Sequence, residues 1–306
     1  MRSGIAILAA ALAALFSGFG GAASASHLGS AEHLAPGGLA SSTADRALQA
    51  RIESYLVDRS GKYGVVVRNL RDGRTVLLNA DEEFPAASLY KLVVMYRVFE
   101  EVEAGSLSMD DTITITSGDT AESYDSDLGS GEKVTVEKAL RAMIAVSSNT
   151  AAHALARVSG GWQRVKDAAG ELSITLGERD GAFTTTPASM AQFFDLLSAG
   201  GLVSNAASEQ MLRILLQQEV NDRIPALLPP EAQVAHKTGE LDEVRNDAGI
   251  VTGPNGGFVI VVMSKEASPD EALNLASYIS LVSYAEYADH PPRLAQARPL
   301  PRDQVE

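Results

Sequence analysis

Short runs of apolar and β-branched residues at both ends of the chain predict β-strands there. Near the start, residues 63–70 and 75–78 have this composition, and the polar turn sequence Arg71-Asp72-Gly73-Arg74 separates them. Near the end, three further strands are predicted at 234–238, 245–252 and 257–264. The turn sequence Gly253-Pro254-Asn255-Gly256 separates the last two of these strands.

Apolar residues at helical spacing predict helices before, between and after these strands. The first covers about 44–57, another covers about 85–104, and a last helix covers about 269–287. The chain between the second helix and about residue 198 is predicted to be mostly helical. The order is therefore helix, two strands, a helical block, three strands and a final helix.

This order predicts an α/β (α+β) fold in which strands from both ends join one antiparallel five-stranded sheet flanked by helices. The helical block forms a second, all-helical lobe. We expect the sheet lobe to comprise residues 42–80 and 200–288, and the helical lobe residues 81–199. Ligands commonly bind in the cleft between two such lobes.

The first 25 residues have the layout of a secretory signal peptide. Arg2 precedes an apolar run over 5–19, and Ala23-Ser24-Ala25 matches a cleavage site, so cleavage after Ala25 and a secreted or periplasmic protein are expected. The alternative is an uncleaved membrane anchor. Residues 26–41 are predicted to be a flexible leader, and residues 289–306 a disordered tail.

Charge and cysteine content exclude some classes of partner. The chain has 25 Lys and Arg against 39 Asp and Glu, a net charge of −14, which argues against nucleic acid or anionic membranes as partners. It has no cysteine, so no disulfides are expected. The five histidines are not spaced as metal ligands, so we expect neither a metal nor another cofactor. A monomer is expected.

The sequence Ser88-Leu89-Tyr90-Lys91 places a nucleophile and a base one helical turn apart. In a helix Ser88 and Lys91 share a face, so a lysine with a lowered pKa can accept the serine proton. The alternative is a capping serine with an exposed lysine. A second Ser-x-x-Lys sequence, Ser130-Gly131-Glu132-Lys133, lies in a Gly-rich polar segment, and we assign it no function.

The sequence Ser147-Ser148-Asn149 lies between predicted helices at 136–145 and 150–157. Its Ser147 hydroxyl can relay a proton to a leaving group, and its Asn149 amide can bind a substrate carbonyl. The alternative is that Asn149 only caps the following helix.

The sequence Lys237-Thr238-Gly239 ends a predicted strand. The Lys237 ammonium and Thr238 hydroxyl can bind a substrate carboxylate. Gly239 allows close backbone approach, so the N–H groups of Glu240 and Ser88 can form an oxyanion hole. In isolation the tripeptide would be a turn with a surface lysine.

In this order, the three motifs resemble those of the class A β-lactamases, within the superfamily of serine β-lactamases and penicillin-binding proteins. The resemblance extends over about 44–287 and includes Asn149-Thr150-Ala151-Ala152 and Thr184-Thr185-Thr186-Pro187. It implies that Ser88 is the acylated nucleophile, Lys91 its general base and Ser147 the proton shuttle. It also implies substrate contacts by Asn149, Lys237 and Thr238.

Two arginines are further candidates for the substrate site. Arg223, in Arg223-Ile224-Pro225-Ala226, and Arg245, on the next predicted strand, can add positive charge near Lys237. The alternative for each arginine is a surface salt bridge.

The resemblance fails at the glutamate that releases the acyl group. Class A enzymes carry a Glu-x-x-Leu-Asn sequence in the Ω loop, whose glutamate activates the hydrolytic water, and nothing within 161–184 matches it. His153 replaces an asparagine that supports this glutamate in many class A enzymes, and Ser148 replaces an aspartate. Glu178 and Asp180 are the nearby acids that can substitute for the missing glutamate.

Three functions are therefore compatible with the sequence. The first is a serine hydrolase of β-lactamase type that releases its product slowly. The second is a D,D-peptidase- or esterase-like hydrolase acting on a peptidoglycan-like acyl substrate. The third is a penicillin-binding domain that is acylated and then stalls. An α/β-hydrolase is disfavoured because the chain has no Gly-x-Ser-x-Gly sequence.

Overall fold

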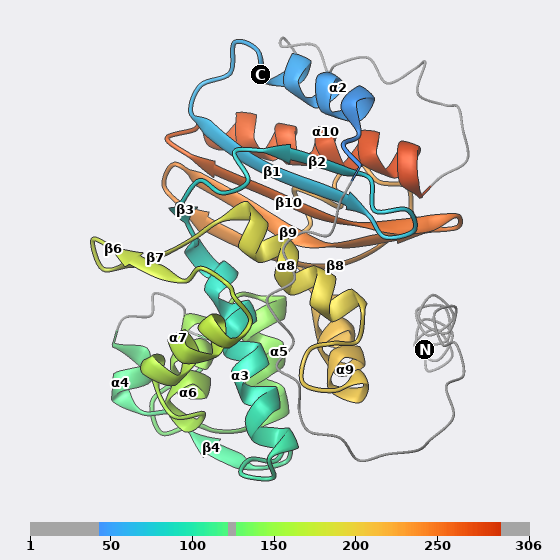
Figure 1. The fold of residues 1–306 in the computed structure, drawn as a ribbon. Helices are drawn as coiled ribbons and strands as arrows, with labels where there is room; N and C mark the ends of the chain where they lie inside the picture. Colours follow the sequence, from blue (N-terminus) through green and yellow to red (C-terminus); the bar gives the residue numbers. More distant parts are fainter. Residues whose placement is uncertain (1–42, 122–126, 289–306) are drawn as a thin grey trace, which may run out of the picture.

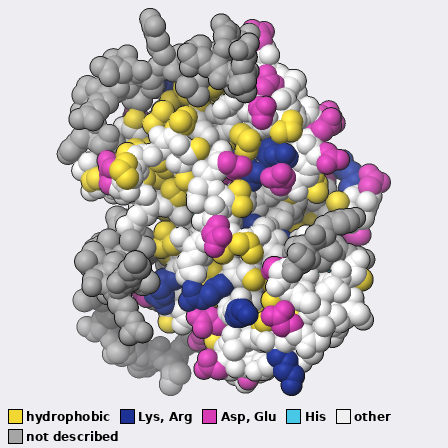
Figure 2. Space-filling view, turned by 180° about the vertical axis from the view of Figure 1, so that it is seen from behind, with side chains coloured by type: hydrophobic (Ala, Val, Ile, Leu, Met, Phe, Trp, Pro, Cys, Tyr) yellow, Lys and Arg dark blue, Asp and Glu magenta, His cyan; other side chains and the backbone are white. Residues whose placement is uncertain are grey.

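The computed structural model describes residues 43–121 and 127–288 of the chain. The predicted signal peptide, leader and tail lie outside these residues. No helix within the described ranges is long and apolar enough to cross a membrane. On the face shown in Figure 2, Lys and Arg side chains are interspersed with Asp and Glu.

The predicted five-stranded antiparallel sheet is confirmed. Its strand order is β2-β1-β10-β9-β8, so the N-terminal hairpin pairs with the C-terminal strands along β1 and β10. The strands are β1 (Lys62–Asn69), β2 (Thr75–Leu78), β8 (Gln233–Leu241), β9 (Val244–Gly253) and β10 (Gly256–Lys265). Their bounds lie within a few residues of the predicted ones.

Each face of the sheet is covered by helices (Figure 1). Helices α2 (Arg46–Leu56) and α10 (Pro269–Tyr287) cover one face, while α8 (Pro187–Ser198) packs on the other. Side chains alternate between these layers because successive residues of a strand point to opposite faces. In β1, Val65 and Val67 pack in the core beside α10, whereas Val66 packs in the core shared with the helical lobe.

The second lobe is built around α3, as Figure 1 shows. Its helices are α3 (Lys91–Glu103), α4 (Ser117–Thr120), α5 (Val136–Ala145), α6 (Asn149–Val158) and α7 (Trp162–Glu171). The lobe also contains a short antiparallel pair, β4 (Thr112–Thr114) with β5 (Lys133–Thr135), which the helical prediction missed. Helix α9 (Asn205–Leu215) leads from α8 towards β8.

The segment around Ser88 differs from the predicted helix. Phe84–Pro85 forms β3, which pairs with β7 (Ala182–Thr185), and helical structure follows Pro85 as expected. Ser88 lies in a 3₁₀ helix, η2 (Ala87–Tyr90), and α3 begins at Lys91. Strand β7 also pairs with β6 (Gly177–Arg179) in a hairpin that was not predicted.

Candidate active site

The three motifs meet at the junction of the two lobes. The Ser147 hydroxyl oxygen accepts hydrogen bonds from two lysine ammonium groups, with Lys91 Nζ at 3.2 Å and Lys237 Nζ at 2.9 Å. These lysines come from α3 and β8, which are far apart in the sequence. The fold therefore concentrates positive charge around one hydroxyl group.

Lys91 is completely buried, so the alternative of an exposed lysine at this position is wrong. Its ammonium donates to Asn149 Oδ1 at 2.7 Å and also to the backbone carbonyl of Ser147. Lys91 is the first residue of α3 and follows η2, which carries Ser88. The start of α3 thus joins the segment that carries Ser88 to the turn that contains Ser147.

Ser147 has a left-handed backbone conformation, with φ at +62°. This conformation is uncommon for residues other than glycine, and such strain persists where surrounding contacts hold it. Here the two lysines bind its side chain. The next residue, Ser148, caps α6 by accepting a hydrogen bond from the Ala151 N–H at 3.1 Å. The predicted capping role of Asn149 is therefore wrong, since Asn149 is the first residue of α6 and its side chain binds Lys91.

Lys237 is also completely buried, on a strand at the edge of the sheet. Burial lowers its pKa well below the usual lysine value of 10.5, and the positive charge of Lys91 lowers that pKa further. The carboxylate of Asp247 acts in the opposite direction. Two buried ammonium groups on one hydroxyl oxygen repel each other, which favours loss of a proton from the pair.

Gly239 brings β8 against the residues around Ser88. A Cβ atom at Gly239 would lie 3.1 Å from the Ala86 carbonyl oxygen and 3.2 Å from the Ser88 nitrogen. Both distances are shorter than ordinary contacts, so only glycine fits without displacing a neighbour. The backbone of Gly239, the residue before Glu240, therefore lies close to the N–H of Ser88.

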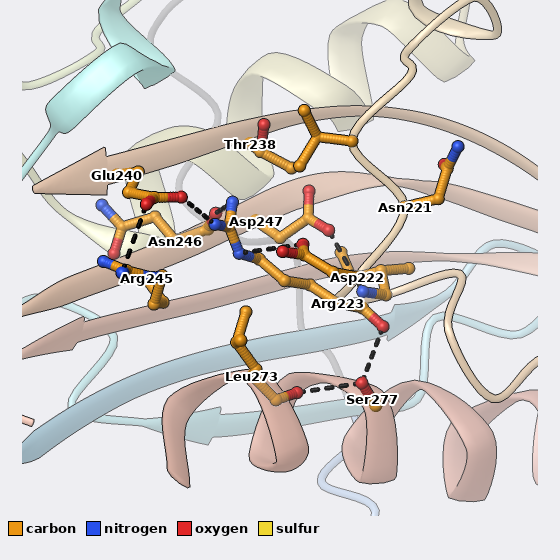
Figure 3. Close-up of polar contacts among 12 residues, drawn as sticks. Asn221, Asp222, Arg223, Thr238, Glu240, Arg245, Asn246, Asp247, Leu273 and Ser277 are labelled. Carbon is orange, nitrogen blue, oxygen red and sulfur yellow. Dashed lines mark hydrogen bonds and ion pairs between the residues drawn. The ribbon is translucent and has the colours of Figure 1, made fainter. Parts of the chain in front are cut away.

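Arg223 and Arg245 both form ion pairs with Glu240 (Figure 3). The distance from Arg223 Nη2 to Glu240 Oε2 is 2.7 Å, and that from Arg245 Nη2 to Glu240 Oε1 is 3.2 Å. Arg223 is buried, so the alternative of a surface salt bridge does not describe it, although the ion pair itself is present. Glu240 and Arg245 are directly opposite each other on β8 and β9.

A model of the "Beta-lactamase enzyme family" matches residues 45–287, which cover nearly the whole described part of the chain. The chain belongs to the β-lactamase enzyme family. It is a serine hydrolase of the β-lactamase type. The match agrees with the resemblance seen in the three sequence motifs.

Individual relatives of this β-lactamase family member have modest sequence identity. Beta-lactamase L2 from Stenotrophomonas maltophilia is 29% identical over 237 residues, covering 71% of this chain and 78% of that protein. Beta-lactamase VEB-1 from Pseudomonas aeruginosa is 26% identical over 251 residues, covering 72% and 84%. The acyl-enzyme complex of a PBP-A mutant with penicillin G has the same fold. Its TM-score is 0.74 at 24% identity, and the match covers 80% of this chain and 97% of PBP-A.

In this β-lactamase-type enzyme, the segment between α7 and α8 contains the β6–β7 hairpin. Glu178 lies on β6, and its carboxylate forms an ion pair with Lys166 at 2.7 Å. Asp180 and Gly181 form the two-residue turn with φ of +53° and +78°. His153 packs edge-on against Trp162, with ring centroids 5.3 Å apart.

Sequence reasoning missed Asn246, which supports the segment before Ser88. Asn246 Nδ2 donates to the Pro85 carbonyl oxygen at 2.8 Å, and Asn246 Oδ1 accepts from the Ser264 N–H at 3.0 Å. The side chain thus ties the chain before Ser88 to β9 and β10. Asn246 lies within a predicted strand, and nothing in that pattern marks it as buried.

A second missed group supports the loop that carries Arg223. Asp247 Oδ1 lies 2.9 Å from His236 Nδ1, and Asp247 Oδ2 accepts the Ile224 N–H at 3.1 Å. His236 Nε2 lies 3.2 Å from Asn221 Oδ1. Asp247 and His236 are buried, so these contacts fix the 221–224 loop against β8 and β9.

Proposed function

We propose that this protein is an exported hydrolase that opens β-lactams by acylating Ser88 and releases the acyl group slowly. The observation that carries the proposal is the Ser147 hydroxyl held between Lys91 and Lys237, both completely buried. A hydroxyl in this position can pass a proton to the leaving nitrogen of the opened ring. Lys91 would remove the Ser88 proton, helped by the repulsion between the two ammonium groups.

The substrate would be oriented by groups on both sides of Ser88. The backbone N–H groups of Ser88 and Glu240 would bind the oxyanion, which the close approach of Gly239 supports. Lys237 and Thr238 would bind the substrate carboxylate, with Arg223 and Arg245 nearby. The side chain of Asn149, which also binds Lys91, would contact the substrate amide.

Slow release follows from the residues between α7 and α8. The class A Glu-x-x-Leu-Asn sequence does not occur there, and Glu178 is paired with Lys166. Loss of a general base typically reduces a rate by about 10²–10⁴, or roughly 3–5 kcal/mol of barrier. The structure of a PBP-A mutant as an acyl-enzyme complex with penicillin G indicates that a stable adduct is compatible with this fold.

The proposal is tested by mixing the purified protein with a chromogenic cephalosporin and following colour and intact mass together. We expect a rapid rise of one equivalent of colour with an adduct on Ser88, followed by slow turnover. An adduct that never turns over would identify a penicillin-binding protein or peptidase instead. If several β-lactams give no colour and no adduct, the whole proposal is contradicted.

Replacing Gly239 with alanine is expected to slow acylation by up to about 10²-fold, because a small displacement of aligned reacting groups has an effect of this size. The added Cβ would push β8 away from Ala86 and Ser88. The measurement is the rate of adduct formation by mass spectrometry. Gly170→Ala, in α7 with nothing within 4 Å of the added Cβ, is the matched control. Equal rates for both variants would exclude a tight fit at Gly239.

Because the pKa of Lys237 is lowered, acylation by substrates that carry a carboxylate is expected to slow at a pH well below 10.5. As pH rises, Lys237 loses its proton well below pH 10.5, and attraction for the carboxylate is lost with it. Acylation by benzylpenicillin should therefore fall relative to acylation by its methyl ester as pH rises from 6 to 10. The Lys237→Arg variant keeps its charge and should remove this difference. A rate ratio independent of pH in the wild type would contradict the prediction.

A further inference from the structure

The side chain of Glu240 places a negative charge within the group of cations proposed to bind the substrate carboxylate. Its two carboxylate oxygens contact two different guanidinium groups, those of Arg223 and Arg245, at 2.7 Å and 3.2 Å. Figure 3 shows the carboxylate between the two arginines, at the end of β8 that also carries Thr238. A carboxylate with one oxygen on each arginine has the geometry expected of a bound anion.

The position of Glu240 on β8 explains why its charge bears on substrate binding. Thr238 and Glu240 are two residues apart on the strand, so their side chains are on the same face. The Thr238 hydroxyl is the proposed anchor for the substrate carboxylate. An anionic substrate group bound there would therefore be a close neighbour of the Glu240 carboxylate.

Burial makes Arg223 dependent on a counter-ion. Its side chain is 1% exposed, whereas that of Glu240 is 56% exposed. Asp222 lies 3.4 Å from Arg223 Nε, which makes no hydrogen bond, and the Asn246 carbonyl oxygen is 3.4 Å from Nη1. Glu240 supplies the short charge-assisted hydrogen bond, which offsets the cost of burying the arginine charge. Glu240 is the exposed partner of this pair, so a substrate approaches the pair from the side of Glu240.

We propose that Glu240 is a specificity-determining residue, whose carboxylate competes with the substrate carboxylate for Arg223 and Arg245. This inference rests on the proposed acylation of Ser88 by β-lactams. The Glu240 charge weakens binding of substrates with a carboxylate beside the scissile amide nitrogen. It favours substrates that are neutral at that position, such as esters. The backbone N–H of Glu240 keeps its separate role in the oxyanion hole.

The test compares Glu240→Gln with the wild type for acylation by benzylpenicillin and by its methyl ester. Glutamine keeps the backbone N–H and the size of the side chain but removes the charge. The quantity compared is the second-order rate constant for acylation by the acid divided by that for the ester. We expect this ratio to be about tenfold higher in Glu240→Gln than in the wild type, and the increase to be smaller in high salt. The control is Glu243→Gln, which removes an exposed acid from the same β8–β9 hairpin and should leave the ratio unchanged.

A second variant, Glu240→Ala, is used in case Glu240→Gln does not fold. It also removes the competing carboxylate and keeps the backbone N–H, so it should likewise raise the acid-to-ester ratio. An acid-to-ester ratio no higher in the Glu240 variants than in Glu243→Gln would overturn the proposal. If no penicillin acylates the wild type, the proposed function itself fails; if acylation occurs without charge discrimination, only the role of Glu240 fails.

Discussion

Replacement of Ser88 by alanine is expected to eliminate the covalent adduct and to reduce β-lactam hydrolysis by about 10⁴–10⁶-fold. The proposed reaction passes through an ester on the Ser88 oxygen, and alanine has no atom that can form it. Ser147 cannot take its place, because its hydroxyl is held between Lys91 and Lys237. Intact-mass measurement after mixing with benzylpenicillin gives the adduct directly, and peptide mapping locates it.

The chain provides a matched control in its second Ser-x-x-Lys sequence. Ser130 is exposed in a turn before β5, so Ser130→Ala should form the adduct at the wild-type rate. An adduct that persists in Ser88→Ala would place the nucleophile elsewhere. Loss of the adduct in Ser130→Ala would show that the nucleophile belongs to the second Ser-x-x-Lys sequence and not to the first.

Replacement of Lys91 by methionine is expected to slow acylation by about 10²–10⁴-fold, the usual contribution of a general base. Methionine fills similar buried space but cannot accept the Ser88 proton or donate to Asn149 Oδ1. Stopped-flow or quenched mass spectrometry gives the acylation rate, and circular dichroism checks that the fold is retained.

Lys133→Met is the corresponding control, since Lys133 is the exposed lysine of the second Ser-x-x-Lys sequence. It should acylate like the wild type. If Lys91→Met acylates within about threefold of the wild type while remaining folded, another group removes the Ser88 proton.

The sheet was predictable because its strands have continuous β-branched and apolar runs bounded by turn residues. Residues 75–78 and the helix over 269–287 were predicted with the bounds that the structure has. The β6–β7 hairpin was missed because its strands are short and β6 is largely exposed, although Asp180-Gly181 is a favoured two-residue hairpin turn. The 3₁₀ helix at Ser88 was missed because the same apolar spacing is compatible with an α-helix starting directly after Pro85.

The site was predictable at its motifs but not in its supporting contacts. Ser147, Lys91 and Lys237 were proposed because three short sequences occur in a known order, and the structure brings these side chains together. Asn246 and Asp247 were not found, because their roles depend on which backbone groups β9 places beside them. The pairing of Glu240 with two arginines likewise requires the register of β8 with β9 and the path of the loop that carries Arg223.

The pairing of β1 with β10 has a consequence for how this protein is made. The two strands come from opposite ends of the described chain, so the central sheet cannot close until β10 has been synthesised. Contacts between such distant segments slow folding, because the long intervening loop must be ordered first. Gly239 reaches Ser88, and Lys237 reaches Ser147, only when β8 has joined that sheet. The proposed acylation site is therefore assembled late in folding.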